Sequence, residues 1–416
     1  MKSPVQSCLI TFVSKSKEEY YETLLKIEIP TLAAFLNIES TTAPITSFVP
    51  PSQPANLFVL IGLPEFMKAL ILSGGHGTRL RPLTYSQQKQ LIPVANKPVL
   101  FYAIEDAIEA GVDEVGIIVG PNKEQVIEIV TSVDWNVPIK FIYQGEPKGL
   151  AHAILVAEEF LDDEFVMYLG DNILKDGIVD HARRFKELNP HALILLTEVE
   201  NPQQFGVAEL DNSGRVIRLV EKPKHPPSNL ALVGVYFFKP VIVEACRNIK
   251  PSWRNELEIT DAIQWLIDNG YRVEASLVKG WWKDTGKPED ILEANRLILD
   301  DISTNIQVET SAKIHGRVVI EKGCEINENT VIKGPVVIGK NVRLKNAYIG
   351  PYTSIGNNCQ IEDTEIEDSI VLEGSEIVNA GRIVESLIGR NVKVLKCETK
   401  PAGRRLIVGD NSKIIL

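Results

Sequence analysis

Lys68-Ala-Leu-Ile-Leu72 runs directly into Ser73-Gly-Gly-His-Gly-Thr-Arg-Leu-Arg-Pro82, and this stretch decides the first part of the fold. Residues 68–72 form a short apolar run, as expected of a strand buried on both faces of a parallel sheet. The glycines after it allow close backbone approach to an anion, and their N–H groups can form a phosphate-binding nest. The spacing is neither G-x-G-x-x-G, which disfavours a nicotinamide-binding enzyme, nor a Walker loop. On residue types alone, an ordinary turn between a strand and a helix is the alternative interpretation.

The charge of the chain changes sign around this loop. The 416 residues include 44 basic and 55 acidic side chains, which gives a formal charge of −11. Between residues 67 and 100 there is no acidic side chain but five basic ones: Lys68, Arg79, Arg81, Lys89 and Lys97. The acidic balance argues against general binding to nucleic acid or to an anionic membrane, since both require a basic surface. The local basic stretch instead suits one small polyanion. No apolar run approaches the roughly 18 residues that a membrane-spanning helix needs.

Strands and helices are predicted to alternate from Met67 to about Leu299. The predicted strands are 68–72, 115–119, 139–143 and 165–169, and the predicted helices are 98–110, 123–131 and 150–160. A hairpin turn is predicted at 211–214, between strands 207–210 and 216–220. Repeated units of this length predict an α/β fold with a Rossmann-like, doubly wound, mixed or mostly parallel sheet. Ligands bind beyond the carboxyl ends of such strands, where the glycine loop and Asp171 fall.

The period of the apolar residues changes to six after about residue 306. Aliphatic side chains recur at Ile314, Ile320, Ile326, Ile332, Ile338 and Leu344, and then, after a slip of one residue, at Ile349, Ile355 and Ile361. This spacing fits neither an α-helix nor a simple strand, and it predicts a hexapeptide-repeat parallel β-helix. We interpret this unit as a module for assembly and stability. A hexapeptide acyltransferase is disfavoured, because the only histidine of the repeats is His315, at their very start.

The first 66 residues differ from the rest of the chain. They combine two ambiguous apolar stretches with a proline cluster at Pro44, Pro50, Pro51 and Pro54. Our preferred interpretation is that the true start is Met67, and the alternative is a poorly ordered extension with a proline-rich linker. The predicted organisation is therefore an extension over 1–66, a catalytic domain over 67–300 and a β-helix domain over 301–416. The five cysteines include no C-x-x-C pair, so neither a disulfide framework nor a zinc site is encoded, and we expect a cytoplasmic protein.

The glycine loop, read as Gly74-Gly-x-Gly-Thr-Arg-Leu-x-Pro-Leu-Thr84, resembles that of the sugar-1-phosphate nucleotidyltransferases. Six further motifs follow in that family's order: Gln144-Gly-Glu-Pro-Lys-Gly-Leu-Ala151, Leu169-Gly-Asp-Asn172, Phe205-Gly-Val207, Val220-Glu-Lys-Pro223, the segment 254–261 and Trp282-Lys-Asp-Thr-Gly286. The resemblance spans about residues 67–416 and is greatest to the thymidylyltransferase branch in its long form, with an appended left-handed β-helix. One departure is Asn255, where short-form members usually carry glycine.

The resemblance implies an enzyme that transfers a nucleotidyl group from a nucleoside triphosphate, preferably dTTP, to a sugar 1-phosphate, preferably glucose 1-phosphate. The implied products are dTDP-glucose and pyrophosphate, formed by in-line attack on the α-phosphate with the help of Mg²⁺. The implied catalytic residues are Arg79, Lys89, Asp171, Lys222 and Asp284, of which Asp171 and Asp284 would bind the metal. Carboxylates suit this role because Mg²⁺ prefers oxygen ligands.

The resemblance also implies a nucleotide-binding set and a sugar-binding set. The nucleotide-binding set is Leu72, Gly74, Gly75, Gly77, Thr78, Arg79, Gln144, Gly149 and Asp171. Arg79 would hold the triphosphate, Gln144 would pair with a pyrimidine edge, and Gly149 would permit close approach beneath the base. The sugar-phosphate set is Gly206, Glu221, Lys222 and Arg254.

Three alternatives concern the function itself. The nearest is the same chemistry with UTP and either glucose 1-phosphate or N-acetylglucosamine 1-phosphate, and the other two are a hexapeptide acyltransferase and a non-catalytic regulatory subunit. The metal aspartates and the loop arginine that a regulatory subunit would lose are all present. We further expect a homo-oligomer that assembles through the β-helix, because a parallel β-helix leaves flat faces and an open end.

Overall fold

The computed structural model describes residues 67–75, 77–121, 123–212 and 214–396. The predictions for residues 1–66 and for the last part of the β-helix domain, residues 397–416, therefore lie outside the described residues. Within the described part of the chain, no helix is both long and apolar enough to cross a bilayer.

A mixed sheet of nine strands forms the centre of the region 67–300. Seven of its strands follow the order β10-β9-β11-β6-β1-β4-β5. Strand β8 also pairs with β11, and β12 pairs with β8. Strand β1 lies between β4 and β6, and it is parallel to both. The strands are β1 (Lys68–Ser73), β4 (Glu114–Val119), β5 (Ile139–Tyr143), β6 (Phe165–Leu169), β8 (Ala192–Glu198), β9 (Gly206–Leu210), β10 (Val216–Glu221), β11 (Leu230–Phe238) and β12 (Val273–Leu277). The predicted α/β class with a mixed sheet is confirmed.

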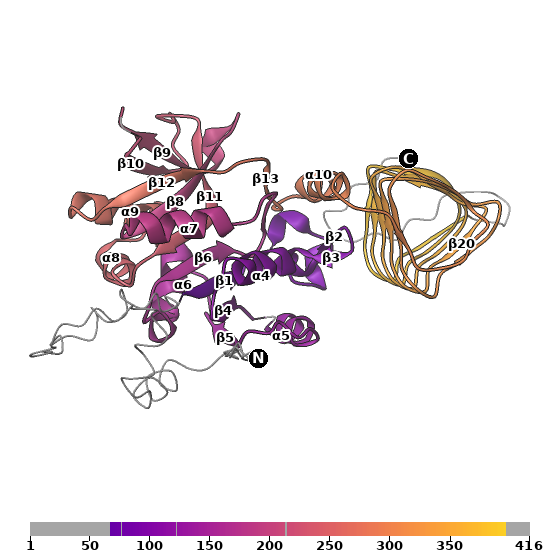
Figure 1. Ribbon diagram of the computed structural model, residues 1–416, viewed down its shortest axis with the longest axis horizontal. Coiled ribbons are helices and arrows are strands. Elements are labelled where there is room, and N and C mark those ends of the chain that lie inside the picture. The colour runs from indigo at the N-terminus through magenta and orange to yellow at the C-terminus, as the bar shows by residue number, and fades with distance from the viewer. Residues whose placement is uncertain (1–66, 76, 122, 213, 397–416) are drawn as a thin grey trace, which may run out of the picture. The chain divides into compact units, whose positions relative to one another are not determined.

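Helices cover both faces of this sheet, as can be followed in Figure 1. One face packs against α4 (Val99–Glu109), α5 (Lys123–Thr131) and α7 (Val179–Leu188), and the other packs against α6 (Leu150–Val156), α8 (Ile242–Asn248) and α9 (Ile259–Asp268). Successive side chains of a strand point to opposite faces, so Leu70 belongs to one core and Ile71 to the other. Both faces of β1 are therefore buried, which explains why its sequence is continuously apolar instead of alternating.

The predicted helix over 150–160 is wrong beyond residue 156. Helix α6 ends at Val156, and the chain continues as a 3₁₀ turn over Glu158–Phe160. Phe160 is 3% exposed, and a Cβ added at Gly116 would lie 2.7 Å from its ring. The tighter turn thus directs the aromatic ring onto the glycine of β4, a packing gain that local helix propensity does not register.

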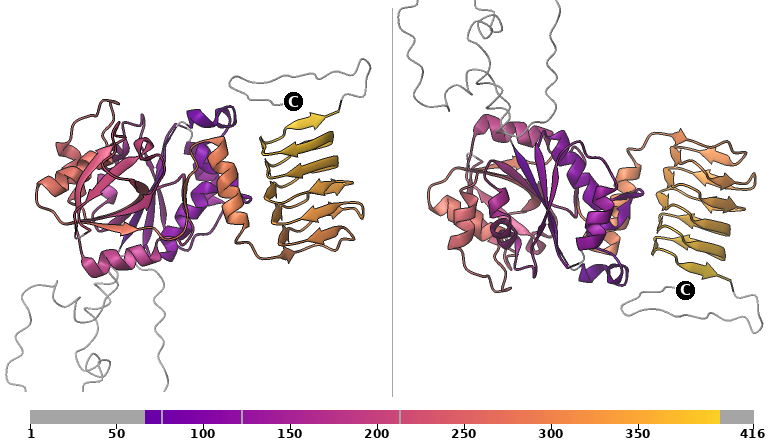
Figure 2. Two further views of the ribbon diagram at one scale, coloured as in Figure 1. Left: turned by 90° about the horizontal axis from the view of Figure 1, so that it is seen from above. Right: turned by 90° about the horizontal axis from the view of Figure 1, so that it is seen from below.

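The described residues from Asn305 onward form the predicted parallel β-helix. Ile314 pairs with Ile332, and Ile320 with Ile338, so one coil takes 18 residues, or three hexads. The next coil is one residue shorter, because Ile332 pairs with Ile349, which accounts for the slip in the repeat. Seen along its axis in Figure 1 the coil is triangular, and Figure 2 shows its strands stacked in rungs. The aliphatic residues of the repeat line its interior core.

Two parallel sheets make up this β-helix. One contains β14 (Asn305–Ile306), β16 (Val318–Ile320), β19 (Val336–Ile338), β22 (Thr353–Ile355), β24 (Ile370–Val371) and β26 (Leu387–Ile388). The other contains β15 (Lys313–His315), β17 (Glu325–Ile326), β18 (Val331–Lys333), β20 (Arg343–Lys345), β21 (Tyr348–Ile349), β23 (Gln360–Glu367), β25 (Glu376–Val384) and β27 (Lys393–Leu395).

A buried asparagine connects the glycine-loop region with the β-helix. Strands β2 (Pro93–Val94) and β3 (Lys97–Pro98) form a hairpin whose turn residues, Ala95 and Asn96, have φ of 48° and 63°. Asn295, on helix α10 (Pro288–Leu299), accepts a hydrogen bond from the Ala95 N–H at 2.9 Å and one from the Ser354 hydroxyl at 2.7 Å. Its amide donates to the carbonyl of Tyr352 at 3.0 Å. Asn295 thereby supports a left-handed turn that is unfavourable for alanine.

We expect replacement of Asn295 by alanine to destabilise the protein by about 2–4 kcal/mol, because Asn295 is 1% exposed and the change leaves several buried polar groups without partners. Urea denaturation of the variant measures this loss. The matched control is Asn329→Ala, since the Asn329 side chain donates to Asn346 on an exposed surface. A loss for Asn295→Ala no larger than that of the control would contradict the prediction.

Candidate active site

The glycine loop after β1 is shaped by Gln88. The Gln88 amide nitrogen donates to the carbonyls of Ser73 at 2.9 Å and of Gly75 at 3.0 Å. Two carbonyl oxygens of the loop are thereby occupied by a protein donor, which suits a loop that has to offer N–H groups to an anion. Gly77 has φ of 59°, and a Cβ added there would lie 2.9 Å from Thr84 Cγ2. The glycine therefore satisfies both a left-handed backbone and a close contact.

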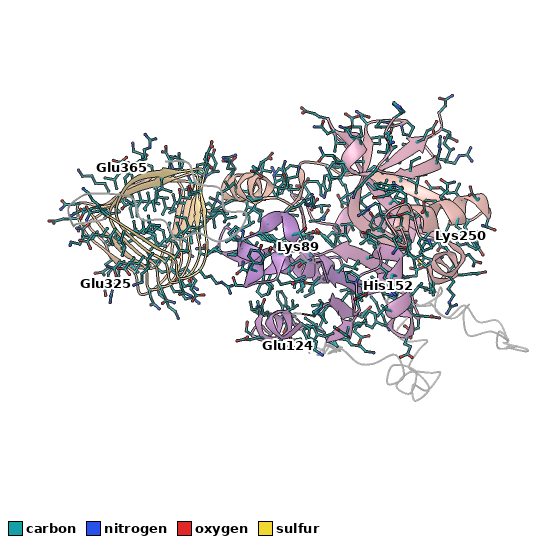
Figure 3. All side chains as sticks on the ribbon, turned by 180° about the vertical axis from the view of Figure 1, so that it is seen from behind. Lys89, Glu124, His152, Lys250, Glu325 and Glu365 are labelled. Atoms are coloured by element: carbon teal, nitrogen blue, oxygen red, sulfur yellow. The ribbon has the colours of Figure 1, made fainter. Side chains whose placement is uncertain are left out.

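Lys89 passes beneath the same loop. A Cβ at Gly75 would lie 3.1 Å from Lys89 Cε, and one at Gly77 would lie 3.0 Å from Lys89 Cβ. The glycines thus make room for the lysine side chain, which is labelled in Figure 3. Its ammonium donates a hydrogen bond to Asp171 Oδ2. The loop and the end of β6 are joined by this contact.

Asp171 and Lys89 form a buried ion pair. Asp171 lies between β6 and the short strand β7 (Asn172–Leu174), is 8% exposed, and accepts a further hydrogen bond from Asn172 at 3.1 Å. Burial would raise the pKa of Asp171, but attraction to Lys89 and hydrogen bonding hold this pKa below its ordinary value. Burial likewise opposes the charge of Lys89, and Asp171 outweighs burial, so the pKa of Lys89 is raised. Both groups are therefore charged.

Asp284 is brought to the Lys89–Asp171 ion pair by the antiparallel pairing of two short strands. It is the last residue of β13 (Trp282–Asp284), where it pairs with Asn172, and the Thr285 N–H and hydroxyl both donate to the Asp171 carbonyl. Burial and then repulsion from Asp171 raise the pKa of Asp284 to about 7. A Cβ at Gly286 would lie 2.8 Å from Arg79 Nη2 and 3.3 Å from Asp284 Oδ2. Arg79, Lys89, Asp171 and Asp284 thus gather in one place, which we call the loop cluster.

A second group of predicted residues gathers at the end of β10. Arg254 lies 3.4 Å from Glu221 and 3.4 Å from Glu258, and Thr260 donates to Glu221 at 3.3 Å. Burial, followed by repulsion from Glu258, raises the pKa of Glu221. The predicted residues Gly206, Glu221, Lys222 and Arg254 are named here the β10 cluster. Gly206 pairs with Glu221, and the Lys222 amine lies 3.7 Å from the Glu221 carboxylate.

The strand register places the two clusters along one edge of the sheet. Tyr168 of β6 pairs with Val235 of β11, so Asp171, three residues on, is level with Leu232. Ala231 pairs with Val207 of β9, which brings Gly206 level with Leu232 as well. The carboxyl end of β6 and the β10 cluster are therefore neighbours across the single strand β11, at the edge where ligands bind in such sheets.

Four further predicted residues occupy less direct positions. Gln144 follows β5, and its carbonyl oxygen would lie 3.1 Å from a Cβ at Gly74. The Leu72 carbonyl is occupied by the N–H of Gly170 at 3.0 Å. A Cβ at Gly149, whose φ is 104°, would lie 2.3 Å from the Leu257 carbonyl oxygen. The glycine therefore allows close approach of another backbone segment, the one that follows Arg254. Thr78 is exposed and begins the 3₁₀ turn Thr78–Leu80, whose last residue is buried.

Comparison with known proteins identifies the family. Residues 68–301 match the nucleotidyl transferase family. The glucose-1-phosphate thymidylyltransferase of Streptomyces antibioticus is 51% identical over 353 residues, which cover 84% of this chain and 99% of that one. This chain belongs to the nucleotidyl transferase family. The bifunctional protein GlmU of Methanocaldococcus jannaschii is 38% identical over 353 residues, covering 82% and 81% of the two chains. A crystal structure of a putative glucose-1-phosphate thymidylyltransferase from Bacillus anthracis superposes with a TM-score of 0.53 and 33% identity, covering 58% of this chain and 98% of that one.

Two residues outside the predicted set, Gln88 and Trp282, shape the loop cluster of the candidate site. Gln88, described above, stands beside Lys89, but nothing in its spacing indicates which carbonyls it binds. Trp282 is not among the predicted site residues, yet its indole N–H donates a hydrogen bond to Asn172 Oδ1 at 2.7 Å. The same oxygen accepts a hydrogen bond from the Gly234 N–H at 3.2 Å. These contacts fix the residue next to Asp171. The available signal was the spacing of two residues between Trp282 and Asp284, which places both side chains on one side of a strand.

Proposed function

We propose that this enzyme transfers a thymidylyl group from dTTP to glucose 1-phosphate, giving dTDP-glucose and pyrophosphate. The observation that carries the proposal is the alignment of the loop cluster and the β10 cluster along one sheet edge. Such an arrangement offers two adjacent anion sites. One lies beneath a glycine loop, and the other lies beside a carboxylate that can accept hydrogen bonds from hydroxyl groups. The names of the two Streptomyces relatives, glucose-1-phosphate thymidylyltransferases that are 48% and 51% identical to this chain, support these substrates.

In the proposed reaction, an oxygen of the sugar phosphate attacks the α-phosphorus while the bond to the departing pyrophosphate breaks. Catalysis of this kind depends mainly on positioning and on neutralising charge. Arg79 and Lys89 would hold the triphosphate, and Lys222 and Arg254 would hold the sugar phosphate against its repulsion. Glu221 would accept hydrogen bonds from the sugar, because burial beside Thr260 and Gly206 fixes its carboxylate at the strand end.

Asp171 and Asp284 are the residues that would hold a divalent cation. Among the described residues, no three His, Cys, Asp or Glu side chains gather to form a complete metal site. A pair of carboxylates nevertheless fits Mg²⁺, which is usually bound by one or two carboxylates together with substrate phosphates and water. The mutual repulsion of the two acids is what a bound cation would relieve. When bound, Mg²⁺ would stabilise the negative charge that develops on the phosphates.

The experiment that tests the proposal measures pyrophosphate release with Mg²⁺, dTTP or UTP, and either glucose 1-phosphate or N-acetylglucosamine 1-phosphate. We expect the highest kcat/KM for dTTP with glucose 1-phosphate. Release confined to UTP with N-acetylglucosamine 1-phosphate would establish the alternative, and no release with any pair would exclude the proposed reaction.

Arg254→Gln is expected to raise the KM for glucose 1-phosphate by about 10- to 100-fold, because a charge-assisted hydrogen bond to the phosphate is lost. The KM for dTTP is expected to change less than about twofold. Steady-state kinetics with each substrate varied in turn measures this separation. Arg247→Gln on α8 serves as the control, because Arg247 is not among the predicted site residues and pairs with Glu158 on an exposed surface. An equal rise in both KM values would argue against a role specific to the sugar phosphate.

The domain organisation and the assembly form part of the same proposal. We place the catalytic unit at 67–300 and the β-helix unit at 301–416, since α10 ends at Leu299 and the first strand of the β-helix begins at Asn305. A homo-oligomer formed through the β-helix would cover strand edges at the ends of its sheets. Light scattering of the purified protein measures the subunit number. A cytoplasmic location stays a prediction from cysteine usage.

A further inference from the structure

Gln144 is held by a histidine that none of the predicted site motifs assigns. The Gln144 Nε2 atom lies 3.1 Å from His152 Nδ1, and His152 is on helix α6, eight residues further along the chain. The opposite atom of the same amide, Oε1, faces the glycine loop, 3.1 Å from the position of a Cβ at Gly74. The amide therefore has a defined orientation, with nitrogen toward the helix and oxygen toward the loop. Figure 3 labels His152.

This orientation requires a particular state of the imidazole. An amide nitrogen only donates hydrogen bonds, so Nδ1 of His152 has to be the unprotonated, accepting nitrogen of a neutral ring. Burial, followed by repulsion from Lys148, lowers the pKa of His152 and keeps the ring neutral at physiological pH. With one amide hydrogen engaged by His152, Gln144 keeps a second hydrogen and its carbonyl oxygen for a ligand.

We propose that His152 is a positioning residue that fixes Gln144 to recognise a pyrimidine with a protonated N3, and so excludes cytosine. The inference rests on the proposed function, in which Gln144 contacts the base. Thymine and uracil present an N3–H donor between two carbonyl acceptors, which matches an amide oxygen beside an amide hydrogen. Cytosine presents an N3 acceptor beside an amino donor, and it would match only the flipped amide. Flipping would place the Gln144 oxygen against the accepting Nδ1, where two lone pairs repel.

Two substitutions at one position separate this role from packing. His152→Leu removes the acceptor, whereas His152→Asn keeps an acceptor, because an asparagine oxygen is bonded to Cγ just as Nδ1 is. We expect His152→Leu to raise the KM for dTTP about tenfold and to lower the preference for dTTP over dCTP about tenfold, with kcat changed less than about twofold, as the loss of one hydrogen bond predicts. His152→Asn is expected to restore both values to within about threefold of wild type.

A matched control and a double-mutant cycle complete the experiment. His181 on α7 bonds the Ser276 hydroxyl at 2.8 Å, so His181→Leu removes a comparable contact and should leave the dTTP preference unchanged. In a Gln144→Ala background, His152→Leu should have no further effect, because His152 acts through Gln144. An unchanged preference in His152→Leu, or equal losses in the leucine and asparagine variants, would overturn the inference.

Calorimetric binding of dTTP and dCTP keeps the inference separate from the reaction. A wild type that binds dTTP but releases no pyrophosphate would exclude the proposed reaction, and the His152 comparison would then be made with dissociation constants. A wild type that binds both nucleotides equally would overturn the inference even if turnover is observed.

Discussion

Asp171→Asn is expected to lower kcat by about 10³-fold, the scale seen when a preorganised electrostatic contact to the reacting group is lost. Two effects combine in this variant. The carboxylate that pairs with Lys89 disappears, and one of the two proposed metal ligands disappears with it. The variant is also expected to lose stability, because removing one partner of a buried ion pair leaves the other charge uncompensated. Pyrophosphate release and thermal unfolding measure the two effects separately.

Asp284→Asn distinguishes chemistry from stability in the same cluster. Burial and repulsion from Asp171 make the Asp284 charge unfavourable in the folded protein, so a neutral amide should fold at least as well as wild type. We nevertheless expect a loss of activity comparable to that of Asp171→Asn. Asp180→Asn, at an exposed position on α7, is the control for both variants. Near wild-type activity in Asp284→Asn would remove this residue from the proposed metal site.

Gly149→Ala is expected to cost more than about 3 kcal/mol of folding free energy, because the added methyl group meets the Leu257 backbone, which cannot move aside as a flexible side chain can. The added Cβ would lie 2.3 Å from the Leu257 oxygen and 2.6 Å from its nitrogen. The change should also raise the KM for glucose 1-phosphate, since displacing Leu257 moves the segment that carries Arg254. Urea denaturation and substrate kinetics measure the two effects.

Gly145→Ala is the matched control for Gly149→Ala. Gly145 also has a positive φ, of 69°, but no atom lies within 4 Å of a Cβ placed there. Its replacement should cost only about 1 kcal/mol, the strain of the backbone conformation itself. If the two variants were destabilised equally, the contact with Leu257 would not be the reason for the glycine.

Local patterns were sufficient to predict many elements and the β-helix. Helix α5 and strands β5 and β6 begin and end at the predicted residues, since each is an amphipathic or apolar run with clear breaks on both sides. The six-residue spacing indicated one inward aliphatic residue per face. It did not indicate that three faces close one coil, which is visible only when Ile314 lies beside Ile332.

The site required information that no local pattern contains. Asp171 and Asp284 are 113 positions apart in sequence, and only the pairing of β7 with β13 brings them together. The family resemblance predicted this pair, whereas spacing alone did not. Gln88 and His152 were missed for a related reason. Gln88 makes two hydrogen bonds to the glycine loop and His152 makes one to Gln144, and the direction of a side-chain hydrogen bond is set by tertiary packing.

The hairpin that follows Lys89 has a consequence for synthesis on the ribosome. Its turn is tied to Asn295 and, through the Asn96 amide, to the Ile355 carbonyl. Chains are made from the amino terminus at roughly 5–20 residues per second, and domains tend to fold in that order. Here the early hairpin has to wait for partners translated some 200 to 260 residues later. A nascent chain that ends between residues 284 and 295 would carry every residue of both clusters and yet lack the contacts that hold this turn.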